Sequence, residues 1–271
     1  MAVRAPIGVF DSGVGGLSVL RAIRQALPHE DLHYIADSAF VPYGGRSEAE
    51  ILERSRLMTR FLVERGVKAI VIACNTATAA AAIRLREEFA LPIVAMEPAL
   101  KPAVAATRSG VVGVLATPGT LGSRRFASLV ERYGRSATVI TQPCVGWVEL
   151  VESGELEGPV TDAALERYLR PLLESRADTL MLGCAPYPFL RPAMERLLQG
   201  EVGIIDTGPA VARQLYRVLA EQGLLRGDGE GREYFWTSGD ATKVQPVVDV
   251  LWPRRVPVQS ASARAATEDF Q

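Results

Sequence analysis

Short apolar runs alternate with amphipathic segments along most of the chain. Residues 7–10 and 32–36 are apolar runs without regular polar alternation. Between them, apolar residues recur at helical spacing over residues 17–27, and a longer amphipathic helix is expected over residues 48–65. Apolar strands joined by helices are typical of a parallel sheet that is covered by helices on both faces.

The second half of the chain repeats this plan at an offset of about 110 residues. The matching segments are 7–10 with 111–115, and 69–73 before Cys74 with 179–182 before Cys184. A repeated order of strands and helices predicts a duplicated α/β half. The expected fold class is therefore α/β, with two pseudo-symmetric parallel-sheet domains and the active site in the cleft between them.

Composition narrows the class of protein. The 271 residues suffice for one large or two small domains, and 48% of them are hydrophobic. A net charge of −1 argues against a nucleic-acid partner. The uncharged segment 70–83 is too short to cross a membrane, and the N-terminus lacks a secretory apolar region. We expect a cytoplasmic protein whose polar tail beyond Pro253 is irregular.

Some reactive residue types are scarce. His29 and His33 are the two histidines, so a histidine metal site or a Ser-His-Asp triad would have to use one of them. The cysteines, Cys74, Cys144 and Cys184, form no C-x-x-C pair and are odd in number, which argues against disulfides and zinc. The chemistry of an enzyme with this composition must come mostly from Cys, Asp, Glu, Ser and Thr.

Polar residues gather where the expected strands end. Ligands of open α/β sheets bind beyond the carboxyl ends of the strands. The residues at these ends are Asp11, Ser12, Asp37, Cys74, Asn75, Thr76, Thr117 and Cys184. If the two halves face each other, Cys74 and Cys184 approach one cleft from opposite sides. Two thiols so placed could remove a proton from one face of a carbon and return one to the other, since a thiol pKa of about 8.5 is easily adjusted.

Each of these residues also has a purely structural interpretation. A cysteine beside a buried strand is commonly a small core residue, and we interpret Cys144 in that way. Asp11 and Ser12 could cap the following helix. The glycines at 13, 15 and 16 could have no role other than to form a tight turn. The glycines make no G-x-G-x-x-G pattern, so a dinucleotide site is weakly supported. The pairing of two cysteines at equivalent positions favours the functional interpretation.

Several motifs together resemble the glutamate racemases of the aspartate/glutamate racemase superfamily. They are Gly-Val-Phe-Asp-Ser-Gly-Val-Gly-Gly at 8–16, Ala-Asp at 36–37, Val-Pro-Tyr-Gly at 41–44, Ala-Cys-Asn-Thr-Ala at 73–77, Gln-Pro-Cys at 142–144, Leu-Val-Glu at 150–152 and Leu-Gly-Cys at 182–184. The resemblance runs from residue 7 to about 245, in order. It implies two α/β domains around a cleft and cofactor-independent interconversion of L- and D-glutamate for peptidoglycan synthesis.

The resemblance also implies roles for individual residues. Cys74 and Cys184 would be the proton donor and acceptor, assisted by Asp11 and Glu152, with Asp37 a weaker candidate. The expected substrate-binding residues are Asp11, Ser12, Tyr43, Gly44, Asn75, Thr76, Thr117 and Ala185. No cofactor and no metal is expected, the partner is the small-molecule substrate, and relatives are commonly homodimers. We place the first domain at 1–97 plus 209–271 and the second at 98–208.

One departure from the family pattern follows the second cysteine. The family usually has Gly-Cys-Thr-His-Tyr-Pro, whereas this chain has Ala185 and Pro186 in place of Thr and His. Ala185 can still offer its N–H to a substrate carboxylate, but Pro186 has none. Acid–base assistance is worth about 10²–10⁴-fold, so we expect slower proton transfer at Cys184. Two alternatives stay open: a related racemase of altered substrate choice, and a non-catalytic amino-acid-binding protein.

Overall fold

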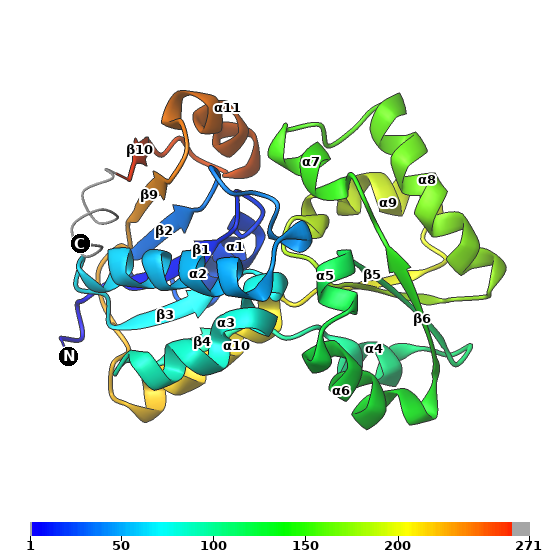
Figure 1. Cartoon of the computed structure of the whole chain (residues 1–271), viewed down its shortest axis with the longest axis horizontal. Coiled ribbons are helices and arrows are strands. Elements are labelled where there is room, and N and C mark those ends of the chain that lie inside the picture. The colour runs from blue at the N-terminus through cyan, green and yellow to red at the C-terminus, as the bar shows by residue number, and fades with distance from the viewer. Residues whose placement is uncertain (1, 262–271) are drawn as a thin grey trace.

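Two parallel β-sheets organise the computed structural model, which describes residues 2–261 (Figure 1). The six-stranded sheet has the order β10-β9-β2-β1-β3-β4, and the four-stranded sheet has the order β6-β5-β7-β8. The strands are β1 (Ile7–Asp11), β2 (Leu32–Ala36), β3 (Ala69–Ile72), β4 (Ile93–Ala95), β5 (Val111–Ala116), β6 (Thr138–Pro143), β7 (Thr179–Leu182), β8 (Gly203–Ile205), β9 (Glu233–Thr237) and β10 (Val258–Ser260). All neighbouring strands are parallel.

Helices connect the strands and pack on the sheets. They are α1 (Leu17–Ala26), α2 (Glu48–Val63), α3 (Asn75–Glu88), α4 (Leu100–Ala106), α5 (Pro118–Leu121), α6 (Arg124–Tyr133), α7 (Trp147–Glu152), α8 (Pro159–Glu174), α9 (Arg191–Leu198), α10 (Gly208–Glu221) and α11 (Ala241–Leu251), with short 3₁₀ turns η1 (Tyr43–Gly45), η2 (Gly134–Ser136) and η3 (Tyr187–Leu190). The start of α2 is set by a capping box in which Ser47 and Glu50 bond each other's backbone N–H.

The two sheets share one topology. The strand order β2-β1-β3-β4 of the first sheet corresponds to β6-β5-β7-β8 of the second, strand for strand along the chain. Cys74 follows β3 and Cys184 follows β7, so the two cysteines occupy equivalent places. The predicted fold class, two pseudo-symmetric parallel-sheet α/β domains, is confirmed, and each half presents a cysteine just beyond the end of a central strand.

The chain leaves the first sheet and later returns to it. Strands of the six-stranded sheet come from residues 7–95 and 233–260, and those of the four-stranded sheet from residues 111–205. Helix α10 packs against α1 and so lies with the first sheet. The boundaries at 97/98 and 208/209 stay a prediction.

The expectation of irregular structure beyond Pro253 is wrong for part of that segment. Residues 258–260 form β10, which pairs with β9 at the sheet edge. The Gln245 side chain supports this strand, because it accepts from the Val258 N–H at 2.7 Å and donates to the Val256 carbonyl at 3.1 Å. A three-residue edge strand has no periodicity that a sequence could reveal. Residues 262–271 lie outside the described residues.

A buried ion pair joins four segments of the first domain that are distant along the chain. The Lys68 side chain is fully buried, and its Nζ lies 2.6 Å from Glu30 Oε2. It also donates to the carbonyls of Val3 at 2.5 Å and Leu224 at 2.8 Å. The other Glu30 oxygen accepts from the Arg226 N–H at 2.9 Å. Each charge is therefore paired and hydrogen-bonded, which is the condition under which buried charges are tolerated.

Replacing Lys68 by Met should lower the free energy of unfolding by about 3–5 kcal/mol, because Glu30 is left as a buried unpaired charge. Urea unfolding measures this change, and Lys101→Met, at an exposed position, is the matched control. The double variant Lys68→Met/Glu30→Met should regain part of the loss. A Lys68→Met protein as stable as the control would contradict this role for the pair.

Candidate active site

The two equivalent cysteines line the same cavity between the two sheets. Its volume is about 20 Å³, which is room for about one water molecule. The lining residues are Asp11, Ser12, Pro42, Tyr43, Gly44, Cys74, Thr76, Thr117, Val148, Glu152, Cys184, Ala185 and Pro186. They come from loops at the carboxyl ends of strands of both sheets and from α7. A ligand as large as an amino acid requires these walls to move apart.

Most of the predicted site residues meet in this cavity. Two predicted residues do not line it: Asn75, and Asp37, the weaker catalytic candidate. Sequence reasoning missed Pro42 and Val148 as lining residues. Val148 precedes Glu152 by four residues on α7, so the helical spacing alone places both on one face and could have indicated it.

Cys74 begins helix α3. Its sulfur accepts from the Ala77 N–H at 3.4 Å, and its thiol donates to Ser12 Oγ at 3.7 Å. The pKa of Cys74 is raised to about 12, mainly by burial and in addition by the neighbouring Asp11 charge, while the Ala77 N–H opposes the rise. The thiol is therefore protonated at neutral pH until a positive charge comes near it.

Asp11 ends strand β1 and lies beside Cys74. One carboxyl oxygen accepts from the Gly16 N–H at 2.6 Å, and the other from Ser12 Oγ at 3.4 Å. Burial raises the pKa of Asp11 to about 6, while these hydrogen bonds and one from Cys74 oppose the rise. Asp11 is thus mostly ionised at neutral pH and can accept a proton from Cys74.

Glu152 reaches from α7 to the opposite half of the molecule. Its Oε1 accepts from the N–H of Val14 at 2.8 Å and of Gly15 at 3.3 Å. Burial raises the pKa of Glu152 to about 8, and the nearby Asp11 charge adds to the rise. Two buried carboxyl groups with separated pKa values are typical of an acid–base site.

The glycine-rich loop allows this close approach. A Cβ atom on Gly13 would lie 2.1 Å from Glu152 Oε1, and one on Gly15 would lie 2.7 Å from Pro186 Cβ. Gly44 meets Thr117 in the same way on the other side, where its ideal Cβ would lie 3.3 Å from Thr117 Cβ. These glycines therefore bring the two halves into contact, in addition to forming a turn.

Cys184 is buried with few polar neighbours. Burial raises the pKa of the Cys184 thiol well above its usual range, the Cys74 charge adds to the rise, and the Ala185 N–H opposes it. Pro186, two residues after Cys184, packs against Gly15 and has no N–H to offer.

Asp37 lies outside the cavity. Its carboxylate accepts from Arg54 Nη2 at 2.6 Å and Nε at 2.8 Å, from the Tyr43 hydroxyl at 2.5 Å and from the Ser238 hydroxyl at 2.5 Å. With both oxygens so engaged, Asp37 positions the Tyr43 side chain. The weaker hypothesis, that Asp37 assists proton transfer directly, gains no support from this geometry.

Asn75 and Thr76 begin helix α3 behind Cys74. Asn75 is buried, and neither polar atom of its side chain has a hydrogen-bond partner among the described residues. The Thr76 hydroxyl lies 3.4 Å from those of Thr117 and Thr120, which belong to the second half. Buried polar atoms are usually hydrogen-bonded, so the Asn75 amide has bonding capacity left for a further partner.

The remaining cysteine and the histidines lie away from the cavity. The Cys144 thiol donates to the Gln142 carbonyl at 3.3 Å, which agrees with the structural interpretation. His33 packs edge-on against Tyr234 and Trp236. Within residues 2–261, no three His, Cys, Asp or Glu side chains lie together as a metal site requires. No helix in the same range has the length and apolar character needed to span a membrane.

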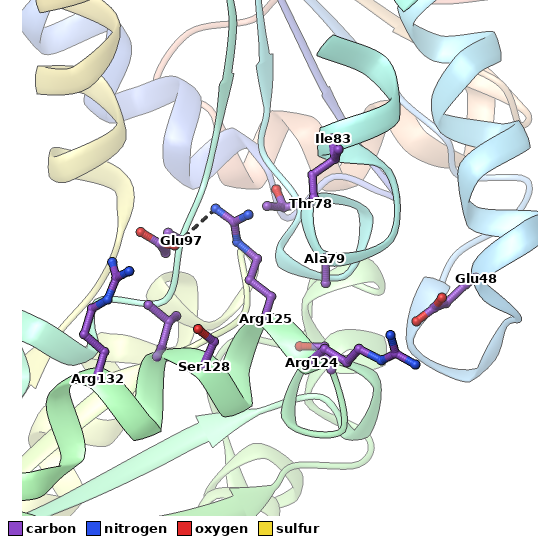
Figure 2. Close-up of a pocket in the computed structure, with 11 residues that line it drawn as sticks. Glu48, Thr78, Ala79, Ile83, Glu97, Arg124, Arg125, Ser128 and Arg132 are labelled. Carbon is purple, nitrogen blue, oxygen red and sulfur yellow. Dashed lines mark hydrogen bonds and ion pairs between the residues drawn. The ribbon is translucent and has the colours of Figure 1, made fainter. Parts of the chain in front are cut away.

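A larger pocket lies between α3 and α6 and contains no thiol (Figure 2). Its volume is about 620 Å³. Arg124, Arg125 and Arg132 of α6 line one wall, and Arg125 pairs with Glu97 at 3.1 Å. The pocket touches α3 at Thr78, one turn beyond Cys74. It is distinct from the cavity that holds the two cysteines.

Comparison with known proteins agrees with this geometry. The family model described as Asp/Glu/Hydantoin racemase matches residues 7–215. The chain belongs to this racemase family. A glutamate racemase of Stutzerimonas stutzeri is 55% identical over 256 residues, which cover 94% of this chain and 97% of that protein. One from Pseudomonas aeruginosa PAO1 is 56% identical over 254 residues, covering 93% and 96%.

Solved structures of the racemase family have the same fold. The glutamate racemase of Thermus thermophilus in complex with beta-chloro-D-alanine has a TM-score of 0.82 at 36% identity, covering 98% of this chain and 100% of that one. The Escherichia coli glutamate racemase, in complex with L-glutamate and the activator UDP-MurNAc-ala, has a TM-score of 0.83 at 32% identity, covering 94% and 97%.

Replacing Gly13 by Ala should reduce racemase kcat/KM by about 10²-fold, because the new methyl group displaces Glu152 and separates the two halves. The matched control is Gly45→Ala, where an added Cβ meets no atom within 4 Å. Steady-state kinetics of both variants provide the measurement. Equal kinetics for the two variants would show that the contact between Gly13 and Glu152 is not needed.

Proposed function

We propose that this protein is a glutamate racemase that interconverts L- and D-glutamate by proton transfer between Cys74 and Cys184, without a cofactor. The observation that carries the proposal is that both cysteines, from equivalent strand ends, line one buried cavity. The curated relatives at about 55% identity are glutamate racemases, and the Francisella tularensis relative was solved with D-glutamate. These matches support glutamate as the substrate.

The reaction needs one thiolate and one thiol at a time. The thiolate takes the proton from Cα and becomes a thiol, which leaves a carbanion, and the opposite thiol then gives its proton to the other face of Cα. The charges of the two cysteines have exchanged at the end of a turnover. We infer that Asp11 accepts the proton of Cys74 when the ammonium group of the substrate enters and offsets the new thiolate charge.

Neutral donors are available for the substrate carboxylates. Among the described residues that line the cavity there is no Lys, Arg or His. Binding therefore falls to backbone N–H groups at helix starts and to the hydroxyls of Ser12, Thr76 and Thr117. The unpartnered amide of Asn75 and the Tyr43-Gly44 turn complete the substrate-binding set, and Glu152 assists the Cys184 side. Fixed donors in a cavity without bulk water stabilise the carbanion strongly.

The Ala185-Pro186 segment bears on the expected rate of proton transfer at Cys184. In place of Thr and His, the chain has a methyl group and a ring without N–H beside Cys184. The expected slower proton transfer at Cys184 stays a prediction. The changed wall also favours testing aspartate beside glutamate as a substrate.

The cellular role follows from the activity. D-glutamate from this reaction would supply peptidoglycan synthesis and so cell-wall biogenesis and cell shape. We propose that the enzyme acts in the cytoplasm and that it is a homodimer, as relatives commonly are. Gel filtration with light scattering measures the oligomeric state.

Replacing Cys74 or Cys184 by Ser should lower the racemisation rate by at least about 10²-fold in both directions, because each direction uses both thiols. Circular dichroism of L- and of D-glutamate follows the reaction. Cys144→Ala, which changes the cysteine outside the cavity, should leave the rate unchanged. Loss of optical activity at the wild-type rate in either serine variant would refute the two-thiol reaction, and no reaction by the wild type would indicate a binding protein.

The rate at low pH should depend on Asp11. The ionised carboxylate accepts the thiol proton, and it is ionised above its pKa of about 6, so kcat/KM should fall as the pH drops through about 6. Initial rates on L-glutamate between about pH 5 and 8 show this limb. Asp11→Asn should be about 10²–10⁴-fold slower and should lack the limb. A wild-type rate that is constant down to about pH 5 would contradict the role of Asp11.

A further inference from the structure

A hydroxyl group of the first half holds the residue that follows Cys184. Ser18 lies in the first turn of α1, and its Oγ donates to the Ala185 carbonyl at 2.6 Å. The bond joins residues 167 positions apart and crosses from the six-stranded to the four-stranded half. Ala185 is buried and lines the cavity. The bond therefore lies at the point where the two halves meet beside the second thiol.

The two backbone groups of Ala185 serve different partners. Its carbonyl accepts from the Ser18 hydroxyl, and its N–H opposes the rise in the pKa of the Cys184 thiol. The carbonyl belongs to the peptide unit that joins Ala185 to Pro186, so the bond from Ser18 fixes the chain directly after Cys184. The neighbouring carbonyl of Cys184 accepts from the Tyr187 N–H at 3.2 Å, which fixes the other side of the turn.

The polar surroundings of the two thiols differ. Cys74 has the Ala77 N–H, the Ser12 hydroxyl and the Asp11 carboxyl beside it. For Cys184, the Ala185 N–H is the group that opposes the rise in the thiol pKa. Because Pro186 offers no N–H, a disturbance of Ala185 has no nearby donor to compensate for it. A shift of the chain at Ala185 should therefore affect Cys184 and leave Cys74 unaffected.

We propose that Ser18 is a positioning residue for Cys184: by holding the Ala185 carbonyl across the interface, it fixes the turn that carries the second sulfur. The proposal rests on the two-thiol racemase function. Loss of the Ser18 hydroxyl weakens proton transfer at Cys184, while Cys74 continues to remove its proton normally. The carbanion made by Cys74 then returns to its starting enantiomer more often.

The variant Ser18→Ala tests this in D₂O. Starting from each pure enantiomer, NMR measures exchange of the α-hydrogen and circular dichroism measures inversion. For the enantiomer deprotonated by Cys74, the ratio of exchange to inversion should rise about 3–10-fold, as expected for the loss of one hydrogen bond. For the opposite enantiomer, which Cys184 deprotonates, the ratio should not rise, because return of the proton through Cys184 slows as well.

Controls separate positioning from a general loss of structure. Ser18→Thr keeps the hydroxyl and should restore the wild-type ratio, and Ser175→Ala removes a hydroxyl-to-carbonyl bond of 2.8 Å within the second half and should change nothing. Thermal unfolding of each variant reports folding. An equal rise of the ratio for both enantiomers, or unchanged ratios, overturns the role of Ser18, whereas a wild-type protein without any exchange overturns the racemase function itself.

Discussion

Two thiols and two carboxyl groups share a cavity with room for about one water molecule, and the cost of ionising them there governs the chemistry. Burial raises the pKa of Asp11 to about 6, of Glu152 to about 8 and of Cys74 to about 12. Asp11 therefore carries the first negative charge as the pH rises. A thiolate forms readily only when a cation offsets it, and the ammonium group of an amino acid is such a cation. The enzyme thus keeps its reactive form for the moment when substrate is bound.

The close contact between the two halves maintains this burial. Gly13 and Gly15 let the loop after β1 approach Glu152 and Pro186 closely. The Glu152 carboxyl group also accepts hydrogen bonds from two N–H groups of that loop. The same contact that excludes water also closes the cavity to a ligand of amino-acid size. Opening and closing of the halves must accompany each turnover, and the bonds across the interface determine where the catalytic groups lie when it is closed.

The strands, the duplication and the pair of cysteines could be predicted from the sequence, because buried parallel strands and the polar residues after them leave a local pattern. The reason for Gly13 could not, since its neighbour Glu152 lies far away along the chain and on the other half. Asp37 looked like a strand-end catalytic residue, yet Arg54 and Ser238 occupy its oxygens. Such contacts depend on tertiary structure, which a single sequence does not reveal.

The central claim is that one substrate carbon lies between two sulfurs. A crystal structure of this protein with bound D-glutamate tests it most directly, through the distances from Cα to the sulfurs of Cys74 and Cys184. We expect each sulfur to lie about 3.5 Å from Cα, with the two sulfurs on opposite faces of that carbon. A complex in which one sulfur faces away from the ligand, or in which glutamate binds outside this cavity, would contradict it.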